Sequence, residues 1–261
     1  APFIAEQAVG LVSVQAEVEL GDKMTETLFA NLEVNEEKSE TLTAFFEASG
    51  FESEYPIRLY YVEEPVVNAF AVPGGKIVVF EGIVDLMDSW EELAGLLGHE
   101  LAHVEERHSL EAMSRSLSTY LVFSIMTGDV NGVGAVLLEN TMMLQDLSNS
   151  RKAEVEADQK GFEYLLGQEV SPRGMIDLFV HLQEAEPDLG EQGNQLMEIM
   201  STHPLTTDRI ANLEKAYEDA GQPSFEEKTE AQALFEQLRA KEMSDLEISE
   251  EEEEETATLD E

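Results

Sequence analysis

The chain has 261 residues, 43% of them hydrophobic, and a formal net charge of −41 from 56 acidic and 15 basic residues. This length and apolar content suffice for one sizeable core, and neither a repeat nor an evident linker divides the chain. The charge argues against nucleic acid as a partner, because phosphates would be repelled and no basic stripe is present. The absence of cysteine excludes disulfides and thiolate metal ligands.

The N-terminal part of the chain, residues 1–54, is expected to be helical. Its apolar residues recur at helical spacing, as at Leu28 and Leu32 and again at Leu42 and Phe45. We expect these helices to pack against the remainder of the domain through their apolar faces.

Residues 55–82 are expected to form a small β-sheet. The runs 57–62 and 66–72 are rich in β-branched and aromatic residues. A third run, 76–80, follows the turn sequence Pro73-Gly74-Gly75 and is expected to form a hairpin with the second. An exposed edge of such a sheet can bind an extended peptide through main-chain hydrogen bonds, although the same strands would also suit a plain core hairpin.

Residues 83–222 are expected to be mostly helical, with Gly and Pro at the breaks between periodic segments. The expected helices are 89–108, 109–126, 133–147, 151–167, 172–184, 191–200 and 206–220. The fold class is therefore α+β, mostly α, with residues 1–222 as a single domain. The remainder, 223–261, is expected to be an acidic tail that is helical as far as Met243 and disordered from about Ser244.

The most informative motif is His99-Glu100-Leu101-Ala102-His103. Apolar residues flank it at helical period, and Ser89 is a candidate N-cap, so the motif is expected inside a buried helix. His99 and His103 then lie one turn apart on one face and can share a zinc ion, while Glu100 can take a proton from metal-bound water. In most isolated matches of this kind, the histidines are instead core residues bonded to main-chain carbonyls.

A catalytic zinc needs a third protein ligand and an open position for water. Carboxylates and the remaining histidines are the candidates, and the best is Glu154, in the helix expected at 151–167. Asp158 lies one turn further on the same face. Glu154 could therefore bind the metal while Asp158 accepts a hydrogen bond from the free ring N–H of a ligand histidine. Glu156, on the other side of this helix, is interpreted as a solvated acid.

These motifs resemble, in the same order, those of the zinc metallopeptidases of the CAAX prenyl protease, HtpX and BepA-like kind. The similarity runs from about Tyr55 to Arg209. It rests on Asn68-Ala69-Phe70-Ala71-Val72-Pro73-Gly74-Gly75, on the His99 to His103 motif continuing to Arg107-His108, on Glu154 to Asp158, and on Ser201-Thr202-His203-Pro204 with Arg209 beyond. The resemblance implies a zincin-like catalytic domain in which the small sheet precedes the active-site helix.

The resemblance also implies roles for individual residues. His99, His103 and Glu154 would bind one zinc ion per chain. Glu100 would be the general base. His203 matches a family histidine that lies over the active site, where it would stabilise the transition state or gate access.

Other polar positions carry weaker expectations. Asn68, Ala69 and Phe70 would contact substrate, although Asn68 could equally cap or position a turn. His108 is interpreted as a structural or surface histidine at the end of the active-site helix. His181 is interpreted as a polar position in an amphipathic helix.

The sequence therefore predicts a zinc endopeptidase that acts on unfolded or extended protein segments, in protein quality control. Zinc would lower the pKa of bound water to about 7, and Glu100 would accept its proton and pass it to the leaving amine. The alternative is a latent or chaperone-like zinc-binding module in which His203 fills the fourth metal position and residues 192–204 act as a lid. A purely structural zinc site would have no use for Glu100.

Two further questions stay open at this level. The high negative charge fits adaptation to a salty or acidic setting, or recognition of basic partners by the run 250–255, although such runs are usually solvated ends. The apolar run 120–126 is too short to span a bilayer, which argues against prenyl-protein processing but leaves membrane association open. The resemblance implies an extracytoplasmic location in a bacterium, and the oligomeric state is undetermined.

Overall fold

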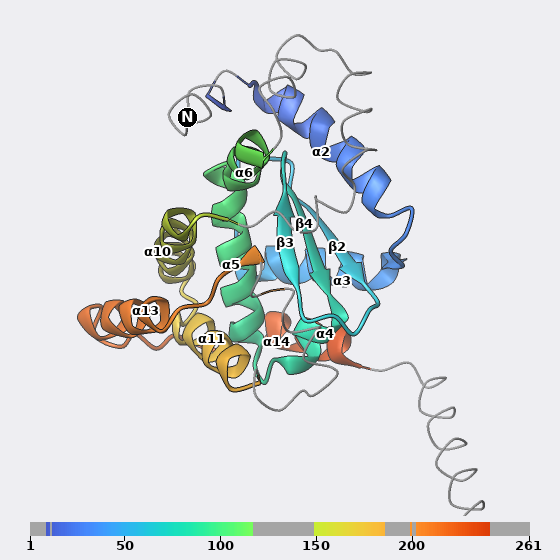
Figure 1. Cartoon of the computed structure of the whole chain (residues 1–261). Helices are drawn as coiled ribbons and strands as arrows, with labels where there is room; N and C mark the ends of the chain where they lie inside the picture. The colour runs from blue at the N-terminus through green and yellow to red at the C-terminus, as the bar shows by residue number, and fades with distance from the viewer. Residues whose placement is uncertain (1–8, 11, 117–148, 186–198, 200–201, 241–261) are drawn as a thin grey trace, which may run out of the picture.

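A four-stranded mixed sheet lies beside a long buried helix, α5, and the other helices are arranged around this pair (Figure 1). The computed structural model describes residues 9–10, 12–116, 149–185, 199 and 202–240. In chain order the elements are α2 (Val14–Leu28), β1 (Val34–Asn35), α3 (Glu36–Ser49), β2 (Arg58–Val62), β3 (Ala69–Val72), β4 (Lys76–Phe80), α4 (Glu81–Leu86), α5 (Trp90–Glu105), α6 (His108–Ser116), α10 (Arg151–Gly167), α11 (Arg173–Ala185), α13 (Thr207–Asp219) and α14 (Thr229–Arg239). This is the α+β, mostly α, architecture expected from the sequence.

The sheet has the strand order β1-β2-β4-β3, in which β2 and β4 are parallel and the other pairs are antiparallel. β3 and β4 form the predicted hairpin, and Gly74 and Gly75 in its turn have positive φ angles of 77° and 90°. Any larger residue at Gly74 would also collide with the main chain of α2, which a Cβ atom would approach to 2.5 Å. β3 lies at an edge of the sheet and contacts α2, α5 and α6.

Helix α5 is enclosed by the sheet, α10 and α11, and almost all of its residues are buried. Two glycines allow this close packing. A Cβ atom at Gly95 would lie 2.7 Å from the main chain of Met175 in α11, and one at Gly161 of α10 would lie 3.1 Å from the main-chain nitrogen of His99. The backbones of α5 and α10 therefore touch, which fixes the histidines of α5 against the first half of α10.

Helix α2 is attached to the hairpin and to the end of α5 by one buried carboxylate. Glu17 accepts hydrogen bonds from the main-chain nitrogen of Gly74 at 3.2 Å, the hydroxyl of Tyr55 at 3.1 Å and Nε of Arg107 at 2.7 Å. Arg107 also donates to the carbonyls of Val9 and Val12. These bonds satisfy the buried carboxylate of Glu17 and the guanidinium group of Arg107. They hold α2 across the top of the sheet in Figure 1.

Four of the expected helices are observed with bounds within three residues of the prediction, whereas α4 was not expected. The helix expected at 151–167 has those bounds, 89–108 is observed as 90–105, 172–184 as 173–185, and 206–220 as 207–219. The helix expected at 109–126 is described from His108 to Ser116. The helix expected at 133–147, most of that at 191–200 and the acidic run 250–255 lie outside the described residues.

The start of α5 differs from the expectation that Ser89 caps it. Ser89 makes no capping hydrogen bond with its side chain. The carboxylate of Glu92 instead reaches back and accepts from the hydroxyl of Ser89 and the main-chain nitrogen of Asp88, both at 3.2 Å. The serine hydroxyl acts as a donor to this carboxylate, so Glu92 and not Ser89 accepts the hydrogen bonds at the start of the helix.

The segment after α13 belongs to the same core. Ala231, Phe235 and Leu238 of α14 are buried among the residues of the main apolar cluster, and α14 packs on α3. Lys228 donates to the carbonyl of Ser49 at 2.8 Å. The disorder expected from Ser244 onward lies outside the described residues.

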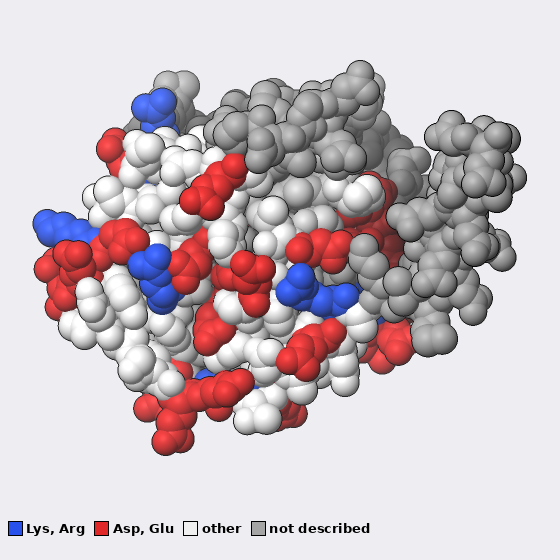
Figure 2. Space-filling model, turned by 90° about the horizontal axis from the view of Figure 1, so that it is seen from below, with Lys and Arg blue, Asp and Glu red and all other residues white. Residues whose placement is uncertain are grey.

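The described surface matches the acidic composition. On the face shown in Figure 2, acidic side chains are spread widely and basic side chains occur singly or in small groups between them. This distribution offers no broad basic area on that face for a phosphate backbone. Among the described helices, none combines the length and the apolar composition needed to cross a bilayer.

Candidate metal centre

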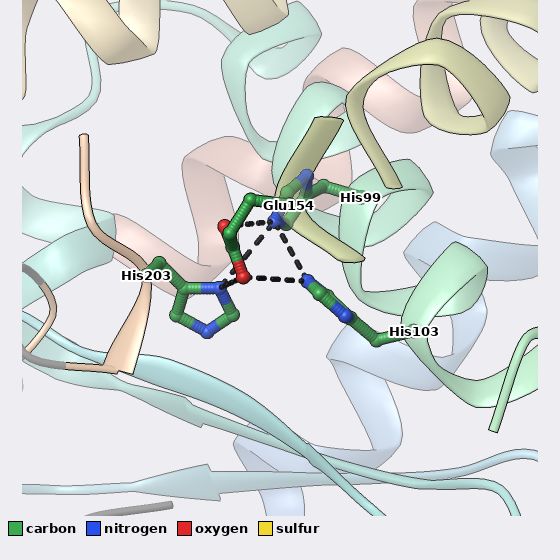
Figure 3. A group of neighbouring side chains, drawn as sticks. All are labelled: His99, His103, Glu154 and His203. Carbon is green, nitrogen blue, oxygen red and sulfur yellow. Dashed lines mark hydrogen bonds and ion pairs between the residues drawn. The ribbon is translucent and has the colours of Figure 1, made fainter. Parts of the chain in front are cut away.

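Four side chains that could bind a metal ion converge between α5 and α10 (Figure 3). His99 and His103 come from consecutive turns of α5, and Glu154 meets them from the first turn of α10. His203 comes from the segment before α13. All four residues are buried, and one ligand atom from each lies within 4.8 Å of the others.

The spacing of these atoms fits a tetrahedral metal ion. Nε2 of His99 lies 3.0 Å from Nε2 of His103 and 3.4 Å from Nδ1 of His203. Oε1 of Glu154 lies 3.4 Å from Nε2 of His103 and 3.3 Å from Nδ1 of His203. A tetrahedron with ligand bonds of about 2.0–2.1 Å has edges of about 3.3 Å. Three imidazoles and a carboxylate therefore present the donor types and the separations that a divalent ion such as zinc requires.

Asp158 and Arg209 lie behind two of these groups. Nδ1 of His99 is 3.1 Å from Oδ1 of Asp158, as the sequence suggested for this acid. Arg209 donates from Nε and Nη2 to the two oxygens of Asp158, both at 2.7 Å, and its Nη1 lies 2.9 Å from Oε2 of Glu154. This bidentate arrangement orients both carboxylates and offsets their charge. The sequence assigned Arg209 no such role, since it follows Asp158 by 51 residues.

Burial and charge together set the protonation of the cluster. Burial acts to lower the pKa of His99, but Asp158 and Glu154 outweigh it and raise that pKa to about 9. Burial acts to raise the pKa of Glu154, but the charge of His203 and the hydrogen bonds from His203 and His99 hold it well below its ordinary range. Burial and the charge of His99 lower the pKa of His103. The carboxylate is thus ionised, as a metal ligand must be.

Glu100 lies beside the cluster with only 1% of its surface exposed. Burial raises the pKa of its carboxyl, although the charges of His203 and His99 act in the opposite direction. The main-chain N–H of Ala71 in β3 hydrogen-bonds this carboxyl, and Oε2 has no hydrogen-bond partner among the described residues. A carboxyl with a raised pKa and an unused oxygen is suited to exchange a proton with water at the metal.

His203 lies inside the cluster rather than above it. Its Nδ1 faces the ligand atoms of His99 and Glu154, and its Nε2 is 3.6 Å from Oε1 of Glu100. The ring thus contacts both the candidate metal ligands and the candidate base, and Figure 3 shows it facing His99, His103 and Glu154. This position is compatible with both roles considered from the sequence, stabilisation of the transition state and gating of access.

Of the two interpretations of His108, as a structural or a surface histidine, the structure favours the first, although the residue begins α6 rather than ending α5. The ring is buried, and its Nδ1 lies 2.9 Å from Nδ1 of His103. Glu156, interpreted as a solvated acid, is partly exposed but brings Oε2 to 3.7 Å from Nε2 of His108. Burial lowers the pKa of His108, while Glu156 acts to raise it. His181 also has a partner, because its Nδ1 lies 2.9 Å from the carboxylate of Glu92.

Of the three residues expected to contact substrate, Asn68 directly precedes β3 and the other two, Ala69 and Phe70, begin it; all three are buried. Neither polar atom of the Asn68 side chain has a hydrogen-bond partner among the described residues. Ala69 is enclosed, and Phe70 lines a hollow together with His203. The next residue, Ala71, donates to Glu100 and accepts from the hydroxyl of Ser109 at 2.6 Å. Main-chain groups of the edge strand are therefore already in use next to the cluster.

Two small hollows adjoin the cluster, and both include His203 in their walls. The first runs between α2 and β3 and is lined by Met24, Leu28, Phe70, Ala71, Val72, Pro73, Ser109, Asn149, Thr202 and His203. The second opens beside the metal ligands and is lined by Leu96, His99, Glu100, Leu178, Phe179, Leu182, Ile199, His203, Leu205 and Arg209. Most of the side chains that line the second hollow are apolar, so the candidate metal centre has an apolar pocket directly beside it.

The sequence model of one protein family, described as Peptidase family M48, matches residues 33–217, which include every residue of the cluster. The chain belongs to Peptidase family M48. Curated relatives carry corresponding names. The chain is 33% identical over 179 residues to a protein of Schizosaccharomyces pombe called mitochondrial metalloendopeptidase OMA1, an alignment that covers 68% of this chain and 51% of the relative.

Two other relatives extend this comparison. A protein of Arabidopsis thaliana with the same name is 35% identical over 160 residues, which cover 59% of this chain and 30% of that protein. The metalloprotease YcaL of Escherichia coli is 29% identical over 154 residues, which cover 56% of this chain and 57% of YcaL. The chain thus spans about half the length, or less, of the two relatives named mitochondrial metalloendopeptidase OMA1.

Proposed function

We propose that this chain is a zinc-dependent endopeptidase that hydrolyses peptide bonds in unfolded or extended protein segments. The observation that carries the proposal is the buried cluster of His99, His103 and Glu154, with Glu100 beside it and a carboxyl pKa raised by burial. Membership of Peptidase family M48 and the names of the relatives support the same reaction. One zinc ion per chain is part of the proposal.

His99, His103 and Glu154 would hold the ion. When bound, the ion supplies a Lewis acid that lowers the pKa of water to about 7. Glu100 takes a proton from the attacking water and returns it to the leaving amine, and its raised pKa brings proton uptake and release nearer to neutral pH. Asp158 keeps the ring of His99 in the orientation and tautomer that directs Nε2 at the ion.

The test of this proposal is cleavage of an unfolded model protein that depends on metal. The chain is loaded with one equivalent of zinc and incubated with a reduced, unfolded protein. We expect cleavage that a chelator abolishes and that added zinc restores. Cleavage that persists after complete removal of the metal would contradict the proposal. So would a zinc-loaded chain that leaves every unfolded substrate intact even when the fourth position on the ion is open to water.

The apolar pocket beside the cluster predicts a preference at the cleavage site. We expect faster cleavage where a large apolar side chain adjoins the scissile bond, since the pocket is walled by leucine, isoleucine and phenylalanine side chains. The half-buried Leu205 offers a way to narrow the pocket. Leu205→Trp should lower kcat/KM for peptides with Leu or Phe next to the scissile bond by about 10–200-fold, and change it little for the matching Ala peptide. Equal losses for both peptides would contradict this use of the pocket.

A second candidate function is favoured by the position of His203. Nδ1 of His203 lies 3.4 Å from Nε2 of His99 and 3.3 Å from Oε1 of Glu154, which is the separation expected for two ligands of one ion. All four positions of a tetrahedral ion would then be filled by protein. Such closure is typical of structural zinc sites, whereas catalytic sites keep one position for water. The arrangement described here would therefore be a latent state, and the chain either opens to cleave or serves as a zinc-containing binding module.

Replacement of His203 separates these possibilities. If the ring closes the site, His203→Ala should raise cleavage of an unfolded protein several-fold while one zinc ion stays bound, because water gains the fourth position. The measurement pairs initial cleavage rates with the zinc content of the same samples. Loss of cleavage with zinc retained would instead assign His203 to stabilisation of the oxyanion. An unchanged rate would contradict both roles.

The setting of the reaction is also proposed rather than read from the fold. We propose a role in protein quality control and a location outside the cytoplasm. Support comes from the name of a bacterial relative, the putative beta-barrel assembly-enhancing protease of Vibrio cholerae. The accumulation of unfolded or damaged proteins in cells that lack this chain, together with fractionation of those that have it, would test both parts.

A further inference from the structure

His108 and Glu156 lie behind the candidate metal centre and take no part in the mechanism above. His108 is the first residue of α6, and Glu156 lies on α10 two residues after Glu154. The ring of His108 touches His103 on the side away from the cluster, with the two Nδ1 atoms 2.9 Å apart. Glu156 approaches the other ring nitrogen of His108.

The turn between α5 and α6 creates this contact. Arg107 has a φ angle of 60°, in the left-handed region that non-glycine residues seldom adopt, and it lies in the turn between the end of α5 at Glu105 and the start of α6 at His108. The side chain of Arg107 is fixed by Glu17 and by the carbonyls of Val9 and Val12. The unusual backbone is therefore held by surrounding structure, and it returns His108 to the ring of His103 five residues earlier.

His103, His108 and Glu156 form a row of three contacting side chains. The chemistry of a metal-bound imidazole fixes the positions of the hydrogens along this row. If Nε2 of His103 binds the ion, its Nδ1 must carry hydrogen and act as a donor. Nδ1 of His108 is then the acceptor, so the hydrogen of His108 is on Nε2, which faces the carboxylate of Glu156. Only one assignment of hydrogens satisfies all three groups, and in it the negatively charged carboxylate of Glu156 accepts the last hydrogen bond of the row.

Helix α10, which carries Glu156, also places a carboxylate directly behind the other ligand histidine, His99. Asp158 of α10 lies 3.1 Å from Nδ1 of His99. We propose that His108 is a positioning residue that orients His103 for metal binding, with Glu156 anchoring His108, so that α10 supplies a metal ligand and a carboxylate behind each histidine of α5. This inference rests on the proposed metal centre but not on its peptidase activity.

His108 and Glu156 should contribute unequally to the affinity for the metal ion. The side chain of His108 is 4% exposed and lies in direct contact with His103, whereas that of Glu156 is 38% exposed and lies 3.7 Å from the ring of His108. Loss of the His108 acceptor should therefore weaken metal binding by about 10–100-fold, the usual effect of removing such a partner. Loss of the Glu156 charge should have a smaller effect in the same direction.

The test measures the dissociation constant of zinc by competition with a chromophoric chelator, without any substrate. His108→Phe keeps a ring but removes the acceptor, and His108→Asn restores an acceptor oxygen near the position of Nδ1. We expect His108→Phe to weaken binding by about 10–100-fold and His108→Asn to recover most of the loss. Glu156→Gln is compared with Glu163→Gln, an acid of the same helix that only Gln159 contacts among the described hydrogen bonds.

Several results would overturn the proposal. One is zinc affinity in His108→Phe within twofold of the wild type. Another is equal weakening in the Phe and Asn variants while both metal-free chains unfold at the wild-type temperature, since a recovered acceptor would then have no effect. A wild type that binds zinc tightly but cleaves nothing would count against the peptidase and not against this row. A wild type that binds no zinc would overturn both.

Discussion

Replacement of Glu100 by glutamine is expected to lower the turnover of an unfolded protein by about 10²–10⁴-fold while one zinc ion stays bound. Glutamine has nearly the same shape, so the buried position beside the cluster is kept. The amide cannot accept a proton from the attacking water at neutral pH. Because Glu100 is absent from the group of four candidate ligands, the metal content should not change.

The measurement pairs initial rates with metal analysis of the same samples. Glu91→Gln is a matched control, since Glu91 lies in the first turn of the same helix, away from the cluster. It should keep the rate of the wild type. A Glu100→Gln enzyme that retains zinc and more than a tenth of the wild-type rate would remove Glu100 from the role of base, and loss of zinc in this variant would show that the carboxylate holds the metal.

Replacement of Arg209 by methionine is expected to destabilise the metal-free chain by about 3–5 kcal/mol at neutral pH. Arg209 is buried and is the only cation within 4 Å of both Glu154 and Asp158 among the described lysines and arginines. Methionine fills part of the volume but leaves the two buried carboxylates with only histidine side chains beside them to offset their charge. Removal of one member of a buried ionic group costs far more than the whole group contributes.

The pH dependence of this loss has a definite sign. Burial acts to raise the pKa of Asp158, but Arg209 and His99 outweigh it and lower that pKa. A carboxyl with a lowered folded-state pKa adds stability above its unfolded value of about 3.9, and this contribution disappears as the pH falls through the folded value. The difference between wild type and Arg209→Met should therefore be largest near neutral pH and should narrow below about pH 4.

Urea unfolding of the metal-free proteins, followed by circular dichroism, measures this difference. Arg173→Met is a suitable control, because Arg173 pairs with Asp177 and Glu214 at a surface where its side chain is 42% exposed. That change should cost at most about 1 kcal/mol. If both variants lost the same small amount, Arg209 would not be needed to offset the buried carboxylates.

The sequence predicted those parts of the site that depend on local periodicity. The histidines of α5 and the acids of α10 are spaced by one turn, so the placement of each pair on one helix face follows from helix geometry alone. The hairpin of β3 and β4 was predictable for a similar reason, since Pro73-Gly74-Gly75 supplies a turn between two β-branched runs.

Contacts that depend on long-range packing were not predictable in the same way. Arg209 meets Asp158 only because α13 packs on α10, and no local pattern records that packing. The partners of His108 depend on the left-handed backbone at Arg107, which is unusual for an arginine. His203 was recognised by resemblance, yet its place within ligand distance of Glu154 depends on the fold of the whole segment before α13.

The metal centre is the claim on which the other conclusions depend, and anomalous X-ray diffraction from zinc-soaked crystals at energies on both sides of the zinc edge tests it most directly. We expect one strong anomalous peak per chain, about 2.0–2.2 Å from Nε2 of His99, Nε2 of His103 and a carboxylate oxygen of Glu154. No peak among these three atoms, with zinc bound only at surface carboxylates, would contradict it.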